Sequence, residues 1–150
     1  MHKVFVYGTL RKGGSNEHFL KGATCTSDQC WTYGELHDTG LGYPAIKQHS
    51  SLKVYGEIYE ITDEELALVD ELEDYVEGGD NNLYDRMKTI VFSQEGEEEV
   101  FVYIGEEQLF QKSSKIESGD WLDYLKKVSI DHLRVDEPDK LYTRLQSEQL

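Results

Sequence analysis

Two stretches of the sequence carry groups that could do chemistry: a carboxylate on the apolar face of a predicted helix, and a glycine-containing turn after a strand. In the helix, apolar residues recur at helical spacing and place on one face Leu66, Val69, Leu72 and Val76. Glu73 follows Val69 by four residues, so we expect its side chain on the same buried face. Burial of a carboxyl raises its pKa, which suits a general acid or base working near neutral pH. The alternative is that the helix ends before Glu73 and leaves this residue in solvent.

The other acidic residues of this helix have simpler explanations. Thr62 and Glu65 stand three residues apart directly before the apolar pattern, which is the arrangement of a capping box. The remaining carboxylates point away from the apolar face or lie at its margin. We expect them on the solvated helix surface: Asp63, Glu64, Asp70, Glu71 and Asp74.

The second stretch is the turn that follows the first predicted strand, where residues 4–13 read VFVYGTLRKG. Glycine turns after strands can leave backbone N–H groups free to point at a ligand. A Walker phosphate loop is one alternative, because the spacing from Gly8 to Gly13 and the position of Ser15 fit, but Gly14 stands where the lysine is needed. The local sequence leaves open an ordinary turn at a sheet edge and an anion-binding turn for a small substrate.

Other reactive residue types form no convincing arrangement. Cys25 and Cys30 are the only cysteines and lack C-x-x-C spacing, and the five histidines form no metal-binding pair. We find no Ser-His-Asp or Cys-His combination that would supply a nucleophile. These residues therefore predict neither a metal site nor an enzyme nucleophile.

The composition limits the classes of partner. Thirty acidic and 15 basic residues give a net charge of −15, which disfavours nucleic acid and anionic membrane surfaces. An anionic substrate would then need a locally favourable pocket, such as oriented backbone amides. The chain has no apolar run of 18 residues and starts with a strand instead of a basic leader, so we expect a cytoplasmic protein with reduced cysteines.

Short strands and helices must position these groups. The patterns predict strands at 3–7, 30–36, 53–61, 84–93 and 100–104, and helices at 16–21, 62–74 and 118–126. Asn16 is a candidate N-cap of the first helix, and Gly56, in mid-strand, indicates a bulge or a close backbone approach. The chain of 150 residues is thus expected to form an α+β domain, with a small mixed sheet that closes or nearly closes and two main flanking helices.

Several segments in order resemble the gamma-glutamylcyclotransferase-like family, in the branch of the gamma-glutamylamine cyclotransferases. The first is FVYGTLR at residues 5–11, followed by Gly13 and Asn16. The later ones are YPAI at 43–46, VYGEIY at 54–59, VDELEDY at 69–75, YDR at 84–86, VY at 102–103 and SGDW at 118–121. Each segment alone is weak, but the ordered set is specific and spans residues 4–125.

This resemblance implies a barrel-like gamma-glutamylcyclotransferase fold for residues 1–128, with 129–150 as a C-terminal extension of unknown role. It places Glu73 at the family's catalytic glutamate, at the end of the segment VDELE. The residues it implies for substrate binding are Tyr7, Gly8, Thr9, Leu10 and Tyr84. Two departures bear on substrate choice: Asp74 stands where glycine is common, and the loop at 77–82 is long and acidic.

The implied reaction releases 5-oxoproline and a free amine or amino acid from a small gamma-glutamyl compound. The substrate's own α-amine attacks the side-chain carbonyl, so the enzyme needs no nucleophile of its own, and the implied reaction requires no metal or organic cofactor. Two other functions remain open: a non-catalytic small-molecule binding module of the same fold, and a biosynthetic enzyme that removes a gamma-glutamyl protecting group.

Overall fold

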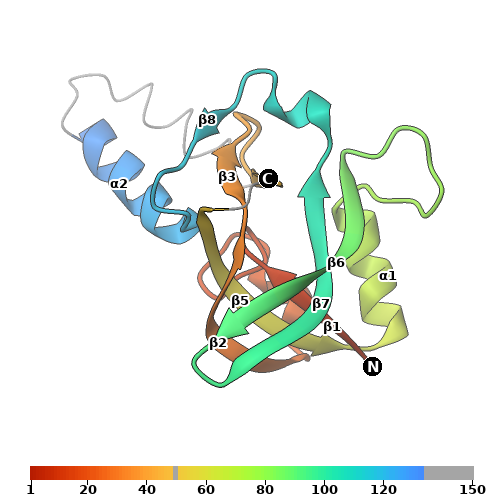
Figure 1. Ribbon diagram of the computed structural model, residues 1–150. Coiled ribbons are helices and arrows are strands. Elements are labelled where there is room, and N and C mark those ends of the chain that lie inside the picture. Colours follow the sequence, from red (N-terminus) through yellow and green to blue (C-terminus); the bar gives the residue numbers. More distant parts are fainter. Residues whose placement is uncertain (49–50, 134–150) are drawn as a thin grey trace.

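The computed structural model describes residues 1–48 and 51–133, and the side chains of residues 1–48 and 51–129. Five strands close into a barrel in the order β1–β5–β2–β6–β7 (Figure 1). Parallel pairing between β1 and β7 closes the barrel, whereas the other neighbours run antiparallel. The barrel strands are β1 His2–Val6, β2 Thr24–Tyr33, β5 Lys53–Ile61, β6 Tyr84–Ser93 and β7 Gly96–Gly105.

A second, three-stranded sheet and two main helices surround this barrel. The small sheet has the order β4–β3–β8, and α1 and α2 lie on opposite sides of the barrel (Figure 1). These elements are β3 Glu35–Asp38, β4 Pro44–Lys47, β8 Ser114–Lys115, α1 Asp63–Leu72 and α2 Trp121–Leu133, with short 3-10 helices η1 Glu17–Leu20 and η2 Glu107–Phe110. The predicted α+β architecture with a closed sheet and two flanking helices is confirmed.

Strand β1 contributes to two hydrophobic clusters because its side chains alternate between two faces. Val4 and Val6 pack in the cluster that contains Leu66 and Val69 of α1. The alternate residue Phe5 packs in the other cluster, together with Val54, Ile58 and Trp121. Burial on both faces fixes the strand firmly, and with it the turn that follows.

Gly56 allows β1 and β5 to approach closely. A Cβ atom at this position would lie 2.2 Å from the carbonyl oxygen of Val6 and 2.9 Å from the ring of Phe5. Any side chain larger than hydrogen would push the two strands apart. The expected close backbone approach at Gly56 is confirmed.

The predicted strand at 30–36 is in fact parts of two strands. Strand β2 runs to Tyr33, Gly34 follows, and β3 begins at Glu35 in the other sheet. Asn16 is also not a side-chain N-cap: it precedes η1 without a capping hydrogen bond, and its amide instead donates to Oγ1 of Thr9 at 3.0 Å. The hydrogen bond to Thr9 thus takes the place of the expected cap.

The C-terminal helix begins at Trp121, which is 1% exposed, and the Asp120 carboxylate caps it by accepting from the N–H of Asp123. It extends to residue 133, beyond the predicted end at 126 and past the predicted domain boundary at 128. Residues 134–150, most of the predicted extension, lie outside the described residues. Within the described part of the chain, no helix is both long and apolar enough to cross a membrane.

Candidate active site

Helix α1 starts at a capping box and carries Glu73 at its end. The Thr62 hydroxyl accepts from the N–H of Glu65 at 3.1 Å, and the Glu65 carboxylate accepts from the N–H of Thr62 at 2.9 Å, as predicted. Regular helix ends at Leu72, but the N–H of Glu73 still donates to the carbonyl of Val69 at 2.9 Å. Glu73 therefore keeps the helical spacing from Val69 and its side chain stays on the buried side. The solvated alternative is wrong, although the helix does end where that alternative placed it.

The chain leaves α1 through a Schellman motif. The N–H of Asp74 donates to Glu71 at 3.1 Å and the N–H of Tyr75 donates to Asp70 at 2.8 Å, the two bonds that define this helix end. Asp74 occupies the left-handed position of the motif, with φ of 54°. Because the chain turns away here, Val76 is 66% exposed instead of continuing the apolar face.

A polar network joins α1 to β6 and β7. The Asp70 carboxylate accepts from the hydroxyl of Tyr103 at 2.5 Å and pairs with the guanidinium of Arg86. That guanidinium also lies over the rings of Tyr75 and Phe101. The prediction that Asp70 is solvated is wrong, since it is half-buried and ties the last turn of α1 to the barrel.

The turn after β1 has both paired and unpaired backbone amides. The N–H of Arg11 donates to Gly8 at 3.1 Å, and the N–H of Asn16 donates to Thr9 at 2.8 Å. Among the described residues, no acceptor engages the N–H groups of Gly8, Thr9 and Leu10. Gly8 packs closely on Pro44, since a Cβ atom there would lie 2.7 Å from Cγ of the proline.

A buried ion pair holds this turn on the barrel. Glu57, which is 3% exposed, accepts from Nε of Arg11 at 2.7 Å and from the N–H of Lys12 at 2.8 Å. The Arg11 guanidinium also pairs with Asp120 at 3.0 Å, and the hydroxyl of Tyr59 donates to Glu57 at 3.2 Å. The turn is thus connected to β5 and to the start of α2 by charged hydrogen bonds.

The carboxyl of Glu73 and the turn meet at one narrow cavity of about 30 Å³, called here the inner cavity. The six residues that the sequence indicated all line it: Tyr7, Gly8, Thr9, Leu10, Glu73 and Tyr84. Sequence reasoning assigned no role to three further residues of the lining, Tyr43, Pro44 and Tyr103. Their signal was present, because all three belong to segments that resemble the family.

Burial controls the electrostatics of the inner cavity. It raises the pKa of Glu73 to about 7, and the carboxyl makes no hydrogen bond with the described residues. Burial, followed by the nearby Glu73 carboxylate, raises the pKa of Tyr7 well above its ordinary value, and burial also raises that of Tyr84. Glu73 is consequently the group on this lining that can gain and lose a proton near neutral pH.

The tyrosine hydroxyls of the inner cavity are already engaged by backbone. Tyr7 donates to the carbonyl of Tyr103 at 2.5 Å, and Tyr84 donates to the carbonyl of Pro44 at 2.6 Å. These bonds hold the β1, β4, β6 and β7 ends together around the cavity. The two rings therefore form part of the cavity wall beside Glu73.

Besides Glu73, the polar side chains on the described lining of the inner cavity are hydroxyls, those of Thr9 and of the tyrosines. This lining includes no Ser, Cys, His, Lys or Arg among the described residues. A substrate carboxylate or an oxyanion would accordingly be recognised by backbone N–H groups, and proton transfer would fall to Glu73. The arrangement suits acyl chemistry in which the substrate supplies the nucleophile.

Comparison with known proteins identifies the class to which this barrel and cavity belong. The family described as "Gamma-glutamyl cyclotransferase, AIG2-like" matches residues 4–123. The chain belongs to this family and is an enzyme of the gamma-glutamylcyclotransferase type.

Individual relatives agree with this assignment. BH1612 of Halalkalibacterium halodurans, which carries the gamma-glutamylcyclotransferase name, is 40% identical over 106 residues, or 70% of this chain and 93% of that protein. The gamma-L-glutamyl-butirosin B gamma-glutamyl cyclotransferase of Niallia circulans is 38% identical over 127 residues, covering 83% of this chain and 78% of that protein. The crystal structure of YkqA from Bacillus subtilis superposes with a TM-score of 0.68 at 27% identity, covering 85% of this chain and 42% of that longer one.

Proposed function

We propose that this enzyme releases 5-oxoproline and a free amine or amino acid from a gamma-glutamyl compound, with Glu73 transferring the proton. The observation that carries the proposal is the position of one carboxyl of pKa about 7 in the same inner cavity as the turn at residues 7–10. The family assignment and the relative named for gamma-glutamyl-butirosin B support the same substrate class.

The reaction needs one proton acceptor and one proton donor, and a single carboxyl can act as both in turn. In the ionised form, Glu73 takes a proton from the substrate's α-amine as its nitrogen attacks the γ-carbonyl carbon. A new C–N bond closes the five-membered ring and the carbonyl oxygen becomes an oxyanion. Glu73 then gives the proton to the departing nitrogen as the original amide C–N bond breaks.

In this proposal the backbone amides of Gly8, Thr9 and Leu10 stabilise negative charge during the reaction. They can donate to the substrate's α-carboxylate or to the developing oxyanion, because the lining formed by the described residues carries no cation to neutralise it. Tyr84 and Tyr7 hold the ring-forming end of the substrate in a site shielded from water. We also infer a reducing compartment such as the cytoplasm, because both Cys25 and Cys30 carry free thiols.

The test is release of 5-oxoproline from gamma-glutamyl-lysine isopeptide, gamma-glutamyl-alanine, glutathione and a gamma-glutamylamine. We expect release from one or more of these with the wild type and a loss of at least about 100-fold in kcat with Glu73→Gln, because proton transfer by a side chain contributes that much. Glu71→Gln is the matched control, since Glu71 is an exposed carboxylate on the same helix and should retain activity.

Retained activity in a folded Glu73→Gln protein would overturn the role of Glu73. If the folded wild type releases no 5-oxoproline from any of these compounds, the proposed reaction is contradicted and the non-catalytic binding module is favoured. Thermal stabilisation by 5-oxoproline or a gamma-glutamyl compound would then be measured. Release only from a larger gamma-glutamyl amide would instead favour removal of a protecting group in biosynthesis.

A further inference from the structure

A second, wider cavity adjoins the site on the side of Glu73. This outer cavity measures about 140 Å³ and shares Thr9, Tyr43, Glu73 and Tyr84 with the inner cavity. Its remaining lining comes from the turn, the end of α1 and the segment before β6: Asn16, Leu72, Asp74 and Leu83. Because both cavities border the same carboxyl, groups on the two sides of a scissile amide can occupy them together.

The chemistry of the two linings indicates which end of a substrate would occupy each cavity. The inner cavity contains the turn whose N–H groups suit the carboxylate of a gamma-glutamyl group. The outer cavity has apolar side chains at Leu72 and Leu83 and a carboxylate at Asp74. It therefore suits an alkyl chain that ends in a positive charge, and it is the place left for the departing amine.

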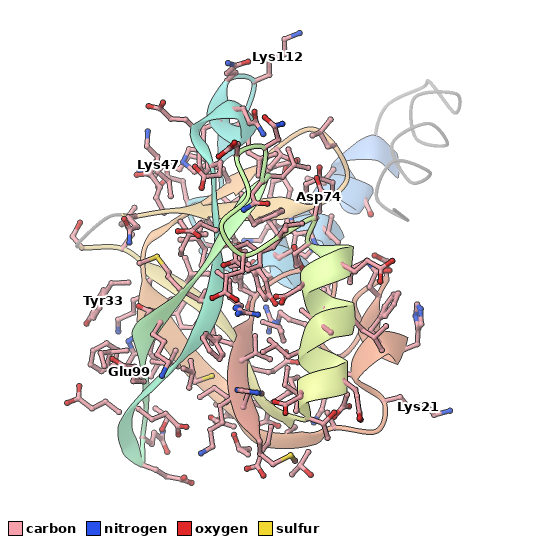
Figure 2. All side chains as sticks on the ribbon, turned by 90° about the vertical axis from the view of Figure 1, so that its right-hand side faces the viewer. Lys21, Tyr33, Lys47, Asp74, Glu99 and Lys112 are labelled. Atoms are coloured by element: carbon pink, nitrogen blue, oxygen red, sulfur yellow. The ribbon has the colours of Figure 1, made fainter. Side chains whose placement is uncertain are left out.

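Asp74 is held in an unusual backbone conformation at this cavity. Its φ of 54° makes it the only non-glycine residue with positive φ in the described part of the chain. Glycine fits this position of a Schellman motif without strain, whereas a residue with a Cβ atom costs free energy there. Figure 2 shows Asp74 just past the C-terminal end of α1. Aspartate and asparagine are the non-glycine residues that adopt this conformation most readily, so the helix end holds a carboxylate on the wall of the outer cavity.

No cation on the lining neutralises Asp74. Among the described residues that line the two cavities, none is Lys, Arg or His. The Asp74 carboxylate also contributes to the raised pKa of Tyr43, behind burial and Glu73, so its negative field reaches the shared wall of both cavities. A leaving group that carries a carboxylate would be repelled there, and one that carries an ammonium would be attracted.

We propose that Asp74 is a specificity-determining residue, and that the enzyme prefers gamma-glutamyl amides whose leaving amine carries a second positive charge. This inference rests on the proposed function, because it treats the outer cavity as the leaving-group side of the substrate. Asp74 takes no part in proton transfer, so its charge acts on the choice of substrate and leaves the chemical step to Glu73.

The test compares two amides that differ in one terminal group. The mono-gamma-glutamyl amide of putrescine ends in an ammonium, and the gamma-glutamyl amide of pentylamine ends in a methyl of similar size. Dissociation constants are measured with Glu73→Gln, which binds without turnover. We expect the putrescine amide to bind roughly two- to fivefold more tightly, the range of a solvent-exposed charge pair, and the preference to shrink at high salt.

The decisive variant is Asp74→Asn added to Glu73→Gln. Asparagine tolerates the left-handed conformation, so the charge is removed while the helix end is kept. The ratio of the two dissociation constants should fall to about one, whereas Glu71→Gln in the same background should leave it unchanged. Equal binding of the two amides, an unchanged ratio with Asp74→Asn, or no binding of either amide would each overturn the proposal.

The same amides separate this inference from the proposed function. Release of 5-oxoproline by the wild type reports the reaction, and the binding ratio reports the preference for charge. A preference that depends on Asp74 without any release would contradict the cyclotransferase reaction and still support Asp74. Release from both amides with equal kcat/KM would support the reaction and contradict the role of Asp74.

Discussion

The burial that raises the pKa of Glu73 to about 7 suits the proposed proton transfer and opposes folding at the same time. An ionised carboxylate without hydrogen-bond partners is less stable in the cavity than in water. Near neutral pH the folded enzyme therefore holds both protonation states in comparable amounts, as a group that alternately accepts and donates a proton requires. Ionisation of the carboxyl therefore lowers the free energy of unfolding.

This linkage predicts how Glu73→Gln changes stability with pH. The pKa of Glu73 is about 7 in the folded protein against an ordinary value of 4.5, so the folded state binds more protons between these values and stability falls as pH rises. Glutamine resembles the neutral carboxyl and removes this loss. From pH 5 to pH 8 the variant should gain about 1–3 kcal/mol in unfolding free energy relative to the wild type, measured by urea denaturation.

Glu71→Gln serves as the control for that experiment. Its carboxylate is exposed, so its difference from the wild type should stay nearly constant over the same pH range. A constant difference for Glu73→Gln as well would mean that Glu73 titrates normally in the folded protein. The role of Glu73 as a general base tuned by burial would then be wrong.

At the scale of the elements, two helix-end motifs place Glu73, and they differ in how visible they are in the sequence. The capping box at Thr62 and Glu65 is recognised from residue types and spacing alone. The Schellman motif is not, because Asp74 stands at the position where glycine would mark the helix end. The helix was consequently predicted two residues too long, while the face that carries Glu73 was predicted correctly.

For the rest of the site, the sequence predicted only features that depend on neighbouring residues in the chain. Helical periodicity describes the face of α1 that packs on the core, but it contains no information about β6 and β7. Asp70 therefore looked solvated, although Arg86 and Tyr103 come to it from those strands. Tyr43 and Tyr103 line the cavity because the fold brings together segments that are distant in sequence. Both residues belong to segments that resemble the family, but the resemblance assigned no role to either.

Close packing between the turn and β4 leads to a prediction for Gly8. In Gly8→Ala the new methyl would lie 2.7 Å from Cγ and 2.9 Å from Cδ of Pro44, so the turn or the proline must move. Overpacking of this kind costs about 1–3 kcal/mol of stability. Movement of the turn should also raise KM, since its amides are proposed to bind the substrate. Urea denaturation and steady-state kinetics measure the two effects.

Gly22→Ala provides the matched control. A Cβ atom at Gly22 meets no heavy atom within 4 Å, so this variant should keep the stability and the KM of the wild type. If Gly8→Ala is as stable and active as Gly22→Ala, the contact with Pro44 does not hold the turn in place. If stability falls while KM is unchanged, the turn is structural and another group binds the substrate carboxylate.

At the scale of the whole molecule, an acidic protein carries a site that is proposed to accept a carboxylate. The net charge is −15, and under the proposed function the inner cavity would bind a carboxylate without a cation on its described lining. Backbone N–H groups solve this problem because they attract an anion at short range without altering the surface charge. Long-range attraction then favours substrates with positive charge, in the same direction as Asp74.

The excess of negative charge should make the stability of the protein depend on salt. Like charges repel most at low ionic strength, so the melting temperature should rise between 10 and 200 mM NaCl. The exposed carboxylates at the β6–β7 hairpin allow a direct test: Glu95, Glu97 and Glu99. Changing all three to glutamine should raise the melting temperature by about 1–3 °C at 10 mM NaCl and by less at 200 mM. A melting temperature that falls with salt in the wild type would instead show that attractive pairs, such as Asp70 with Arg86, outweigh the repulsion among the carboxylates.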